Sequence, residues 1–533
     1  VVNRNTKAIR YFLGANGYTT TNTAAELNAL RASFAQWQAI SGTVLKFEEG
    51  GLAFGAVDVN TSDNTNVVFW STDTMVDGGN SDISGRLGVT FSSFFNDGTF
   101  AEADIVLNAA ENEWSADFFS TNTARFFVEG VALHEMGHFI GLSHSPVGAA
   151  TMFWAGGPGT GTQVGLSTDE LCAARLIYAA TNHLSNLGAL RGQVTRLGSP
   201  VFGSAVFAED TNGVLVAGTV TDSSGQYQLF AMPPGNYQVR STPLDAPSAS
   251  AFLARGWEID FDFSAADSSF LPTTNIAVSV LAGTNTLNFA VASGGPLFRI
   301  TEIRYPTTTG GSYQWNSVPI TLRQGQSNFI IGVAAANLPT SGATLSISGT
   351  GITVGNTIFN ANIAGLNFIS ANVSVASNAP PGPRTLTVVQ GANRAYANGF
   401  LDIVPVAPDY NFDGLDDTFQ RRHFPLFTAT NAAPTADPDG DTMPNASEYI
   451  AATNPTNAAS LMKIDSVVKT VNGATITFRS VSGKHYQLYG RALVASGSWQ
   501  PIGSLVTAGG ATAQASDTSG VLGEKFYRVV VLP

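Results

Sequence analysis

The segment HEMGHFIGLSHS, residues 134–145, constrains the fold of this chain more than any other stretch. His134 and His138 are four residues apart, which on an α-helix places both imidazoles on one face, one turn apart. Gly141 follows, and glycine adopts the positive φ that ends a helix without steric cost. A turn there brings His144 back toward the other two histidines. The sequence therefore predicts a helix, a sharp turn and three clustered imidazoles.

Clustered neutral imidazoles are a common ligand set for Zn²⁺, and three protein ligands leave one coordination position open, as catalytic zinc sites do. A bare HExxH pattern arises often by chance in helices that bind no metal. Here five residues are fixed over eleven positions, namely His134, Glu135, His138, Gly141 and His144, so chance is a poor explanation. The pattern predicts zinc on the three histidines, with Glu135 close enough to act as general base.

Two further segments predict helices around this motif. TNTARFFVEGVAL, residues 121–133, supplies apolar side chains for a helix, and Thr121 or Thr123 could cap it. STDELCAARLIY, residues 167–178, places Ser167 and Glu170 at the spacing of a capping box. We expect the chain's single cysteine, Cys172, to be a small buried residue of that second helix.

The extended histidine motif resembles the metzincin signature, in which a methionine turn lies beneath the zinc. Met152, eight residues after His144, matches that methionine, and Ser145 is typical of the matrixin branch. Segments 34–49, 102–114 and 167–178 also resemble parts of a matrixin domain. The resemblance is closest to bacterial matrixin-like enzymes and covers residues 1–182. It implies an α+β zinc endopeptidase in which a zinc-bound water attacks the scissile carbonyl while Glu135 accepts and returns the proton.

The chain departs from animal matrixins in several places. Those enzymes hold a second, structural zinc with upstream histidines, and no histidine precedes His134 here. Asp104, Asn108 and Glu111 could bind Ca²⁺ instead or form a solvated loop. Trp154 stands where some metzincins have a tyrosine that approaches the metal, which an indole cannot do.

An extended substrate needs an edge strand beside the metal, and residues 88–95, GVTFSSFF, are the candidate for that strand. The peptide specificity depends on residues 152–166, and the many glycines of this loop leave its conformation open.

Composition bounds the class of protein. A length of 533 residues predicts several domains. Only 12% of residues are charged, and Gly, Ala, Ser, Thr and Asn are frequent, as in extracellular β-rich proteins. The net charge of −13 disfavours nucleic acid as a partner and suits cations. No run approaches the roughly 20 apolar residues of a membrane helix. We expect a secreted protein, extracellular or on the cell surface.

Beyond the histidine domain, short alternating strands and frequent turns predict β-sandwiches. Residues 187–295 resemble a carboxypeptidase regulatory-like or transthyretin-like module, with turns at Ser224-Gly225 and Pro234-Gly235. Residues 296–405 resemble an immunoglobulin-like sandwich, and residues 461–533 predict a C-terminal sandwich.

Residues 406–460 contain two acidic loops, 409–420 and 437–448, with the ligand spacing of EF-hand loops. The candidate Ca²⁺ ligands are Asp409, Asn411, Asp413, the Leu415 carbonyl, Asp417 and Gln420 in the first loop, and Asp437, Asp439, Asp441, the Met443 carbonyl, Asn445 and Glu448 in the second. Only the first loop has glycine at position 6, Gly414, but it ends in a weak ligand. Unliganded acidic turns are the alternative.

The two loops resemble dockerin or thrombospondin type 3 calcium segments. Their starts are 28 residues apart, which favours a calcium-stiffened joint over a cohesin-binding module.

The sequence therefore predicts a multidomain zinc endopeptidase that acts on proteins or peptides, with Zn²⁺ and Ca²⁺ as cofactors. The alternative is a surface or filament-forming structural or adhesion protein that retains a metzincin domain. Its β-modules would then serve self-association or cell-surface attachment. The low charge favours an assembly role, whereas the intact Glu135 favours catalysis.

Overall fold

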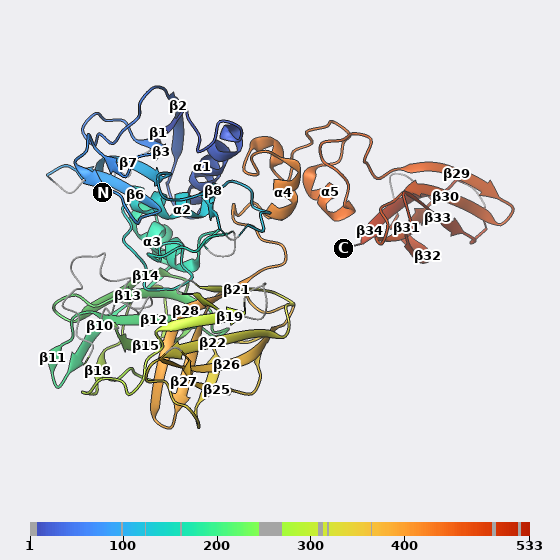
Figure 1. Ribbon diagram of the computed structural model, residues 1–533. Coiled ribbons are helices and arrows are strands. Elements are labelled where there is room, and N and C mark those ends of the chain that lie inside the picture. The colour runs from blue at the N-terminus through green and yellow to red at the C-terminus, as the bar shows by residue number, and fades with distance from the viewer. Residues whose placement is uncertain are drawn as a thin grey trace. The chain divides into compact units, whose positions relative to one another are not determined.

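The computed structural model describes residues 8–96, 100–122, 124–159, 163–244, 269–306, 313–316, 319–363, 365–492, 497–520 and 524–532. The chain divides into two compact units, Val1–Tyr410 and Asn411–Pro533 (Figure 1). No helix within these described ranges is long and apolar enough to cross a membrane.

The first unit begins with a mixed sheet and helices, in agreement with the α+β prediction. The strand order is β2-β1-β3-β7-β6, with β1 (Ile9–Gly14), β2 (Phe47–Ala53), β3 (Val67–Ser71), β6 (Gly88–Phe94) and β7 (Phe100–Asn108). Neighbouring strands are parallel except β6, which runs antiparallel to β7 at the edge of the sheet. The remaining elements are α1 (Thr23–Gln38), α2 (Val128–Phe139), α3 (Thr168–Tyr178), η1 (His183–Asn186) and the short pairs β4 (Met75–Val76) with β5 (Ser81–Asp82) and β8 (Trp114–Ser115) with β9 (Phe126–Phe127).

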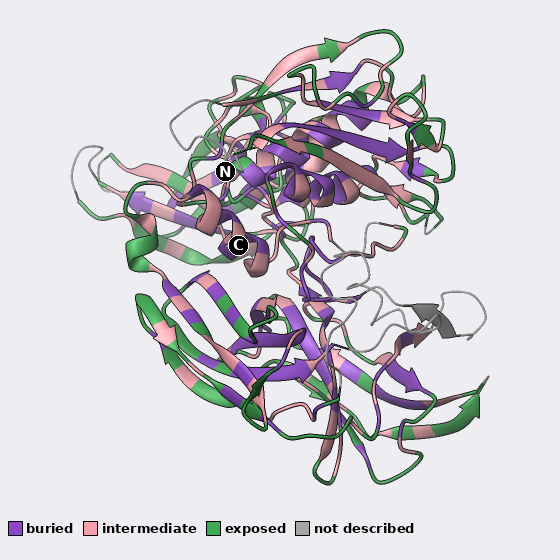
Figure 2. Ribbon diagram, turned by 90° about the vertical axis from the view of Figure 1, so that its left-hand side faces the viewer, coloured by how far each residue is buried: buried purple, intermediate pink, exposed green. Residues whose placement is uncertain are grey.

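The apolar core of this region fixes α2 against α1. Trp37 of α1 and Leu133 and Met136 of α2 are fully buried among the core residues. Buried residues are coloured purple in Figure 2. The Trp37 indole donates to the Leu133 carbonyl at 3.0 Å, and the Gln36 amide donates to the Glu129 carboxylate at 2.5 Å. A helix held by both packing and buried hydrogen bonds is a rigid support for side chains on its other face.

The predicted cap of α2 is wrong at Thr121, and Thr123 lies outside the described residues. The helix begins at Val128, and its N-cap, Phe127, has an extended backbone. The reason is the short parallel pairing of β9 with β8, which keeps the chain extended until residue 127. The helix end agrees with the sequence, because Gly141 follows the C-cap with φ +93°.

Two sheets follow α3. One contains β11-β10-β14 with β17 and β18 on β10, and the other has the order β13-β12-β15-β16. The strands are β10 (Gly188–Arg196), β11 (Ser199–Pro200), β12 (Ser204–Asp210), β13 (Leu215–Val220), β14 (Gln226–Met232), β15 (Gly235–Pro243), β16 (Ile276–Val280), β17 (Gly283–Thr286) and β18 (Phe289–Val291). We call this region the first sandwich, because both sheets contribute to one apolar core.

The last part of the first unit is a second sandwich. Its sheets have the orders β20-β19-β22-β26-β24, with β25 on β26, and β21-β28-β27-β23. The strands are β19 (Glu302–Pro306), β20 (Tyr313–Asn316), β21 (Ile320–Arg323), β22 (Phe329–Ala335), β23 (Thr344–Ile347), β24 (Ile352–Val354), β25 (Ile358–Ile363), β26 (Leu366–Val375), β27 (Gly382–Gln390) and β28 (Asn393–Val404).

The second unit contains short helices and a small sandwich. The helices are α4 (Asp417–His423), η4 (Thr430–Ala432) and α5 (Asn445–Ala451). The sheets have the orders β29-β30-β33 and β32-β31-β34, with β29 (Ile464–Thr470), β30 (Gly473–Arg479), β31 (His485–Arg491), β32 (Gln500–Thr507), β33 (Thr512–Asp517) and β34 (Phe526–Leu532).

Within the first unit, α3 joins the helical region to the first sandwich. It lies directly beside β13 and β14 (Figure 1). Its start carries the predicted capping box, with Ser167 and Glu170 bonded reciprocally, and Cys172 is buried as expected.

Candidate metal centre

The structure brings the three predicted histidines together. His134 and His138 lie one turn apart on α2, and the turn after Gly141 returns His144 to them. The Nε2 atom of His138 is 3.2 Å from the Nε2 atoms of both His134 and His144. Tetrahedral zinc with Zn–N distances of about 2.05 Å requires ligand nitrogens roughly 3.3 Å apart. The three nitrogens therefore have the spacing that one zinc ion needs.

Backbone carbonyls orient two of these imidazoles. His134 Nδ1 lies 2.7 Å from the Thr151 carbonyl, and His138 Nδ1 lies 2.8 Å from the Leu142 carbonyl. A carbonyl only accepts hydrogen bonds, so each Nδ1 donates and each Nε2 keeps its lone pair free for a metal.

The surroundings keep His134 and His144 neutral. Burial lowers the pKa of His134 well below its ordinary value, and the neighbouring imidazoles of His138 and His144 lower it further. Burial and His138 lower the pKa of His144 to about 3. Neutral imidazole is the form that binds metal, so these two imidazoles are already in the form that a zinc ion needs.

Met152 lies against the helix that carries two of the histidines. It is 1% exposed, and a Cβ on Gly137 would come within 2.1 Å of the Met152 sulfur, so a larger residue at position 137 would displace the methionine side chain. The Met152 amide donates to Glu170 at 2.8 Å, and its carbonyl accepts from the Ser145 amide at 2.8 Å. These contacts fix the turn that the sequence predicts at this methionine.

Glu135 is buried beside the histidines, with 4% of its surface exposed. The Thr90 hydroxyl on β6 lies 2.7 Å from Glu135 Oε2 and 2.9 Å from the Glu135 carbonyl oxygen. Burial raises the pKa of Glu135, while His138, the Thr90 hydroxyl and Arg86 lower it. A carboxylate with a raised pKa is a better proton acceptor near neutral pH.

A cleft of about 740 Å³ opens in front of these residues. One wall is β6, an edge strand that covers residues 88–94 of the predicted segment. Phe153, Trp154 and Ala155 also line the cleft, together with the three histidines and Glu135. An extended peptide could therefore pair with β6 while crossing the metal centre.

Comparison with known families agrees with this geometry. Residues 3–179 match the Matrixin peptidase family. The chain carries a matrixin domain. Residues 189–251 match the carboxypeptidase regulatory-like domain, as the sequence pattern predicts for this region. No curated protein matches the chain.

Several solved structures resemble parts of the chain only slightly. They include 5-hydroxyisourate hydrolase of Klebsiella pneumoniae, with 19% identity over 20% of this chain and 87% of that chain and a TM-score of 0.13. BcpA, the major pilin subunit of Bacillus cereus, has 11% identity over 41% of this chain and 69% of that chain, with a TM-score of 0.14. The Bacillus anthracis TIE protein has 10% identity over 41% and 50%, with a TM-score of 0.15. Similarities at these TM-scores support no conclusion about the fold or the function of this protein.

The acidic residues proposed for calcium in the matrixin domain do not form one site. Asp104 and Asn108 are four residues apart on extended β7, which separates them by about 13 Å. Asp104 accepts hydrogen bonds from the Asn60 and Val67 amides. Asn108 and Glu111 instead bond to each other at 3.0 Å. The hydrogen bond between Asn108 and Glu111 therefore stabilises the loop that contains Glu111.

The second acidic loop gathers three carboxylates. Oxygen atoms of Asp437, Asp439 and Asp441 lie within 4.8 Å of one another. Glu448 is fully buried, and neither of its oxygens has a hydrogen-bond partner among the described residues. Burial raises the pKa of Glu448 to about 7, the nearby Thr453 hydroxyl lowers it, and the three aspartates raise it further. Unpartnered buried oxygens beside clustered carboxylates are costly without a cation.

The first acidic loop shares some internal hydrogen bonds with the second. The Leu415 amide donates to Asp413 at 2.8 Å, as the Met443 amide does to Asp441 at 2.8 Å. Its last candidate ligand, Gln420, is buried and donates to Asp413 at 2.8 Å. Asp409 belongs to the first unit, and the ligands from Asn411 onward belong to the second.

The helices that follow the loops begin at the ninth position of each, Asp417 and Asn445. Asn445 is fully buried, and its amide nitrogen donates to the carbonyls of Asn431 and Ala433 at 2.9 and 2.8 Å.

Sequence reasoning missed Thr90, which holds Glu135, and the carbonyls that orient the histidines. Thr90 lies in the predicted edge strand, but nothing in its spacing distinguishes it from the neighbouring residues. Trp154 lines the cleft. The sequence predicts it at a position close to the metal, without a role as a metal ligand.

Proposed function

We propose that this protein is a secreted, zinc-dependent endopeptidase that hydrolyses internal peptide bonds of proteins or peptides. The observation that carries the proposal is the spacing of 3.2 Å between the imidazole Nε2 atoms beside a buried glutamate in a cleft. The matrixin match of residues 3–179 supports the same chemistry. The extracellular location is supported by the composition.

The residues of the chain divide the work of hydrolysis. The edge of β6 binds the substrate backbone in an extended form. His134, His138 and His144 would hold a zinc ion, which would supply the Lewis acidity that activates water and polarises the scissile carbonyl. Glu135 accepts the proton of the attacking water and returns it to the leaving amine. Thr90 keeps the Glu135 carboxylate in position for both transfers.

The test compares Glu135→Ala with the wild type on a peptide library, with zinc content measured in both. The matched control is Glu113→Ala, which removes an exposed glutamate of the same domain. We expect Glu135→Ala to keep one zinc and lose activity at least 10²-fold, on the order of one lost general base. The control should retain activity. Cleavage by Glu135→Ala at the wild-type rate contradicts the proposal.

The alternative of a surface or filament-forming protein has a separate outcome. A wild-type protein that binds zinc but cleaves no peptide, and that elutes far above 55.6 kDa in gel filtration, would favour it over the enzyme.

We also propose that Ca²⁺ binds the second acidic loop, and the first loop less tightly. The proposal is supported by the clustered aspartates and the buried Glu448, which offers two oxygens to a cation. Gln420 at the same position of the first loop offers one neutral oxygen. Asp441→Ala should therefore weaken calcium binding in calorimetry more than Asp413→Ala. The reverse order would contradict the assignment of the tighter site.

A further inference from the structure

Residues 145–155, which we call the clamp segment, run from the third histidine to the cleft. Its inner side belongs to the metal centre. The Thr151 carbonyl orients His134, Met152 packs on Gly137, and Phe153 and Trp154 line the cleft. The segment contains turns and bends but no helix or strand. Its position therefore depends on what packs against its outer side.

The first sandwich covers one part of that outer side. Val147 and Ala150 are fully buried in an apolar cluster with Phe207 and Leu215. The Ser145 hydroxyl donates to Asp169 on α3 at 2.6 Å, and the other Asp169 oxygen accepts from the Gly218 amide of β13 at 2.8 Å. One carboxylate thus ties the start of the clamp segment to the first sandwich.

The second sandwich covers the rest through β28. The Gly148 amide donates to the Asn398 carbonyl at 3.0 Å. A Cβ on Gly148 would lie 2.6 Å from the Phe400 ring, so the two chains are in close contact. The rings of Phe153 and Phe400 meet edge to face, with centroids 5.2 Å apart. Phe153, a cleft residue, belongs at the same time to the buried core of the second sandwich.

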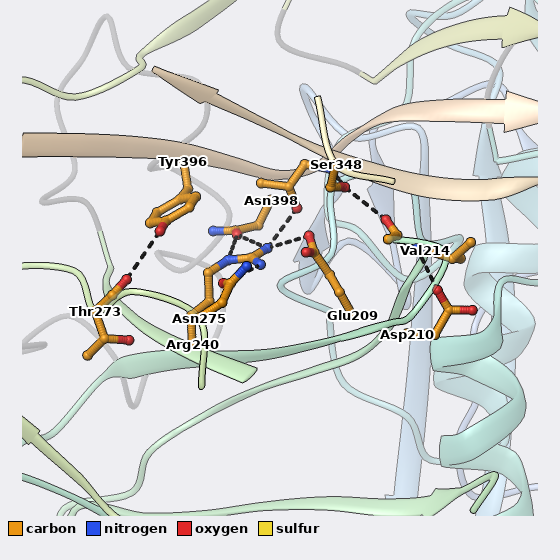
Figure 3. A network of polar contacts seen from close by, with 11 residues as sticks. Glu209, Asp210, Val214, Arg240, Thr273, Asn275, Ser348, Tyr396 and Asn398 are labelled. Atoms are coloured by element: carbon orange, nitrogen blue, oxygen red, sulfur yellow. Dashed lines mark hydrogen bonds and ion pairs between the residues drawn. The ribbon is translucent and has the colours of Figure 1, made fainter. Parts of the chain in front are cut away.

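A buried arginine fixes the strand that makes these contacts. Arg240 of β15 donates to the Asn398 side chain through Nε at 2.9 Å and Nη2 at 2.7 Å (Figure 3). The same guanidinium pairs with Glu209 at 2.9 Å and bonds to Thr385 at 2.7 Å. Arg240 is 1% exposed, so these charge-assisted bonds are shielded from water. Asn398 therefore holds the clamp segment with its backbone while the first sandwich holds its side chain.

We propose that Phe400 and Asn398 are positioning residues of the cleft, and that both sandwiches are parts of the active site rather than appended modules. Phe400 and Asn398 act through the clamp segment. This segment forms the part of the cleft wall that faces the substrate residue next to the metal, and its position determines the position of that wall. The catalytic consequence rests on the proposed function. A displacement of about 1 Å of a group that positions the substrate can change rates about 10²-fold.

The experiment uses the full chain with Phe400→Ala, Phe400→Leu and the control Ile369→Ala. Ile369 is a fully buried residue of β26 in the same core. Zinc content, kcat, KM and the cleavage-site profile on a peptide library are measured for each. We expect Phe400→Ala to keep zinc, to raise KM about tenfold and to change the preferred residue after the scissile bond. Phe400→Leu should restore most of both properties, because it refills the contact with Phe153.

Ile369→Ala should lower the melting temperature and leave KM and the profile as in the wild type. An unchanged profile and KM in Phe400→Ala, or the same change in both alanine variants, would overturn the proposal. If the wild type cleaves no peptide, the proposed function has failed, and amide hydrogen exchange of residues 145–155 then decides. Faster exchange in Phe400→Ala than in Ile369→Ala supports the positioning role, and equal exchange overturns it.

Discussion

At the residue scale, the proposed hydrolysis depends on small groups that hold the reactive side chains in position. Glu135 is fixed by the Thr90 hydroxyl at 2.7 Å and lies against Gly88, where a Cβ would come within 2.8 Å of the carboxylate. Burial alone would leave this side chain free to choose among rotamers. The contacts from β6, the strand that borders the cleft, select one of these rotamers.

Thr90→Val should lower kcat about tenfold while zinc content stays the same, because valine keeps the shape but loses one hydrogen bond to a charged group. Thr90→Ser, which retains a hydroxyl, should restore most of the rate. Steady-state kinetics with metal analysis check this. A valine variant with wild-type kcat would show that Glu135 needs no such support.

The ligand residues of the centre were predictable, because their spacing follows from helix geometry and one glycine turn. Their partners were not. The Thr151 carbonyl and His134 are 17 residues apart in the sequence, and a backbone carbonyl cannot be recognised from residue types. For Asp104, Asn108 and Glu111 the sequence left calcium binding and a solvated loop open, and the distance between Asp104 and Asn108 along extended β7 disfavours a shared calcium site.

At the element scale, helix ends determine the local geometry. The capping box of α3 was predictable from Ser167 and Glu170, whereas the start of α2 was not, because the pairing of β8 with β9 keeps the chain extended beyond Thr121. Glu170 also accepts the Met152 amide, so the helix start and the methionine turn share one carboxyl group. This sharing places Glu170 in a fully enclosed environment, 1% exposed.

Glu170 should make the stability of the matrixin domain depend on pH. Burial, with the Asp169 charge adding to it, raises its pKa to about 7, against hydrogen bonds from Met152 and Ser167 that lower it. The folded state therefore binds the proton of Glu170 more tightly than the unfolded chain does, because the ordinary pKa of a glutamate is about 4.5. Stability from this group is highest below pH 4.5 and falls as pH rises toward 7. Glu170→Gln should flatten the melting temperature between pH 5 and 7. If the melting temperature of Glu170→Gln depended on pH as steeply as that of the wild type, a group other than Glu170 would cause the dependence.

The acidic loops differ at position 6. Gly414 has φ +84°, and the equivalent Thr442 has φ 79°, a strained value for a β-branched residue. Thr442→Gly should relieve about 1 kcal/mol of strain and tighten calcium binding to the second loop about fivefold, if calcium binding requires this backbone. Calorimetry against Gly414→Ala, which should weaken the first loop, checks it. Weaker binding by Thr442→Gly would mean that chain stiffness matters more than strain.

At the scale of the whole molecule, the sandwich patterns were readable from alternating strands, but their junction was not. Arg240 and Asn398 are 158 residues apart, and no local pattern links them. From the sequence alone, each of these two side chains would be interpreted as a polar residue on the exposed face of a strand. The burial of Arg240 and its contact with Asn398 become visible only when the two sandwiches meet around the clamp segment.

Removal of calcium should loosen the second unit selectively. In a Glu135→Ala background, which prevents self-cleavage, a calcium-selective chelator should raise the rate of proteolysis within residues 411–460. The sandwiches should stay intact, because their cores are apolar. Glu448→Gln should be sensitive even with calcium present, since it loses a charged ligand. Digestion patterns that do not change with chelator or variant would show that this segment is ordered without a cation.

The most direct test of the account is a zinc titration of the metal-free protein, followed by peptide cleavage. Activity should rise linearly and saturate at one zinc per chain, and His138→Ala should show neither tight zinc binding nor cleavage. Full cleavage by the metal-free protein, or tight zinc retention by His138→Ala, would contradict the claim that the three histidines hold a catalytic zinc.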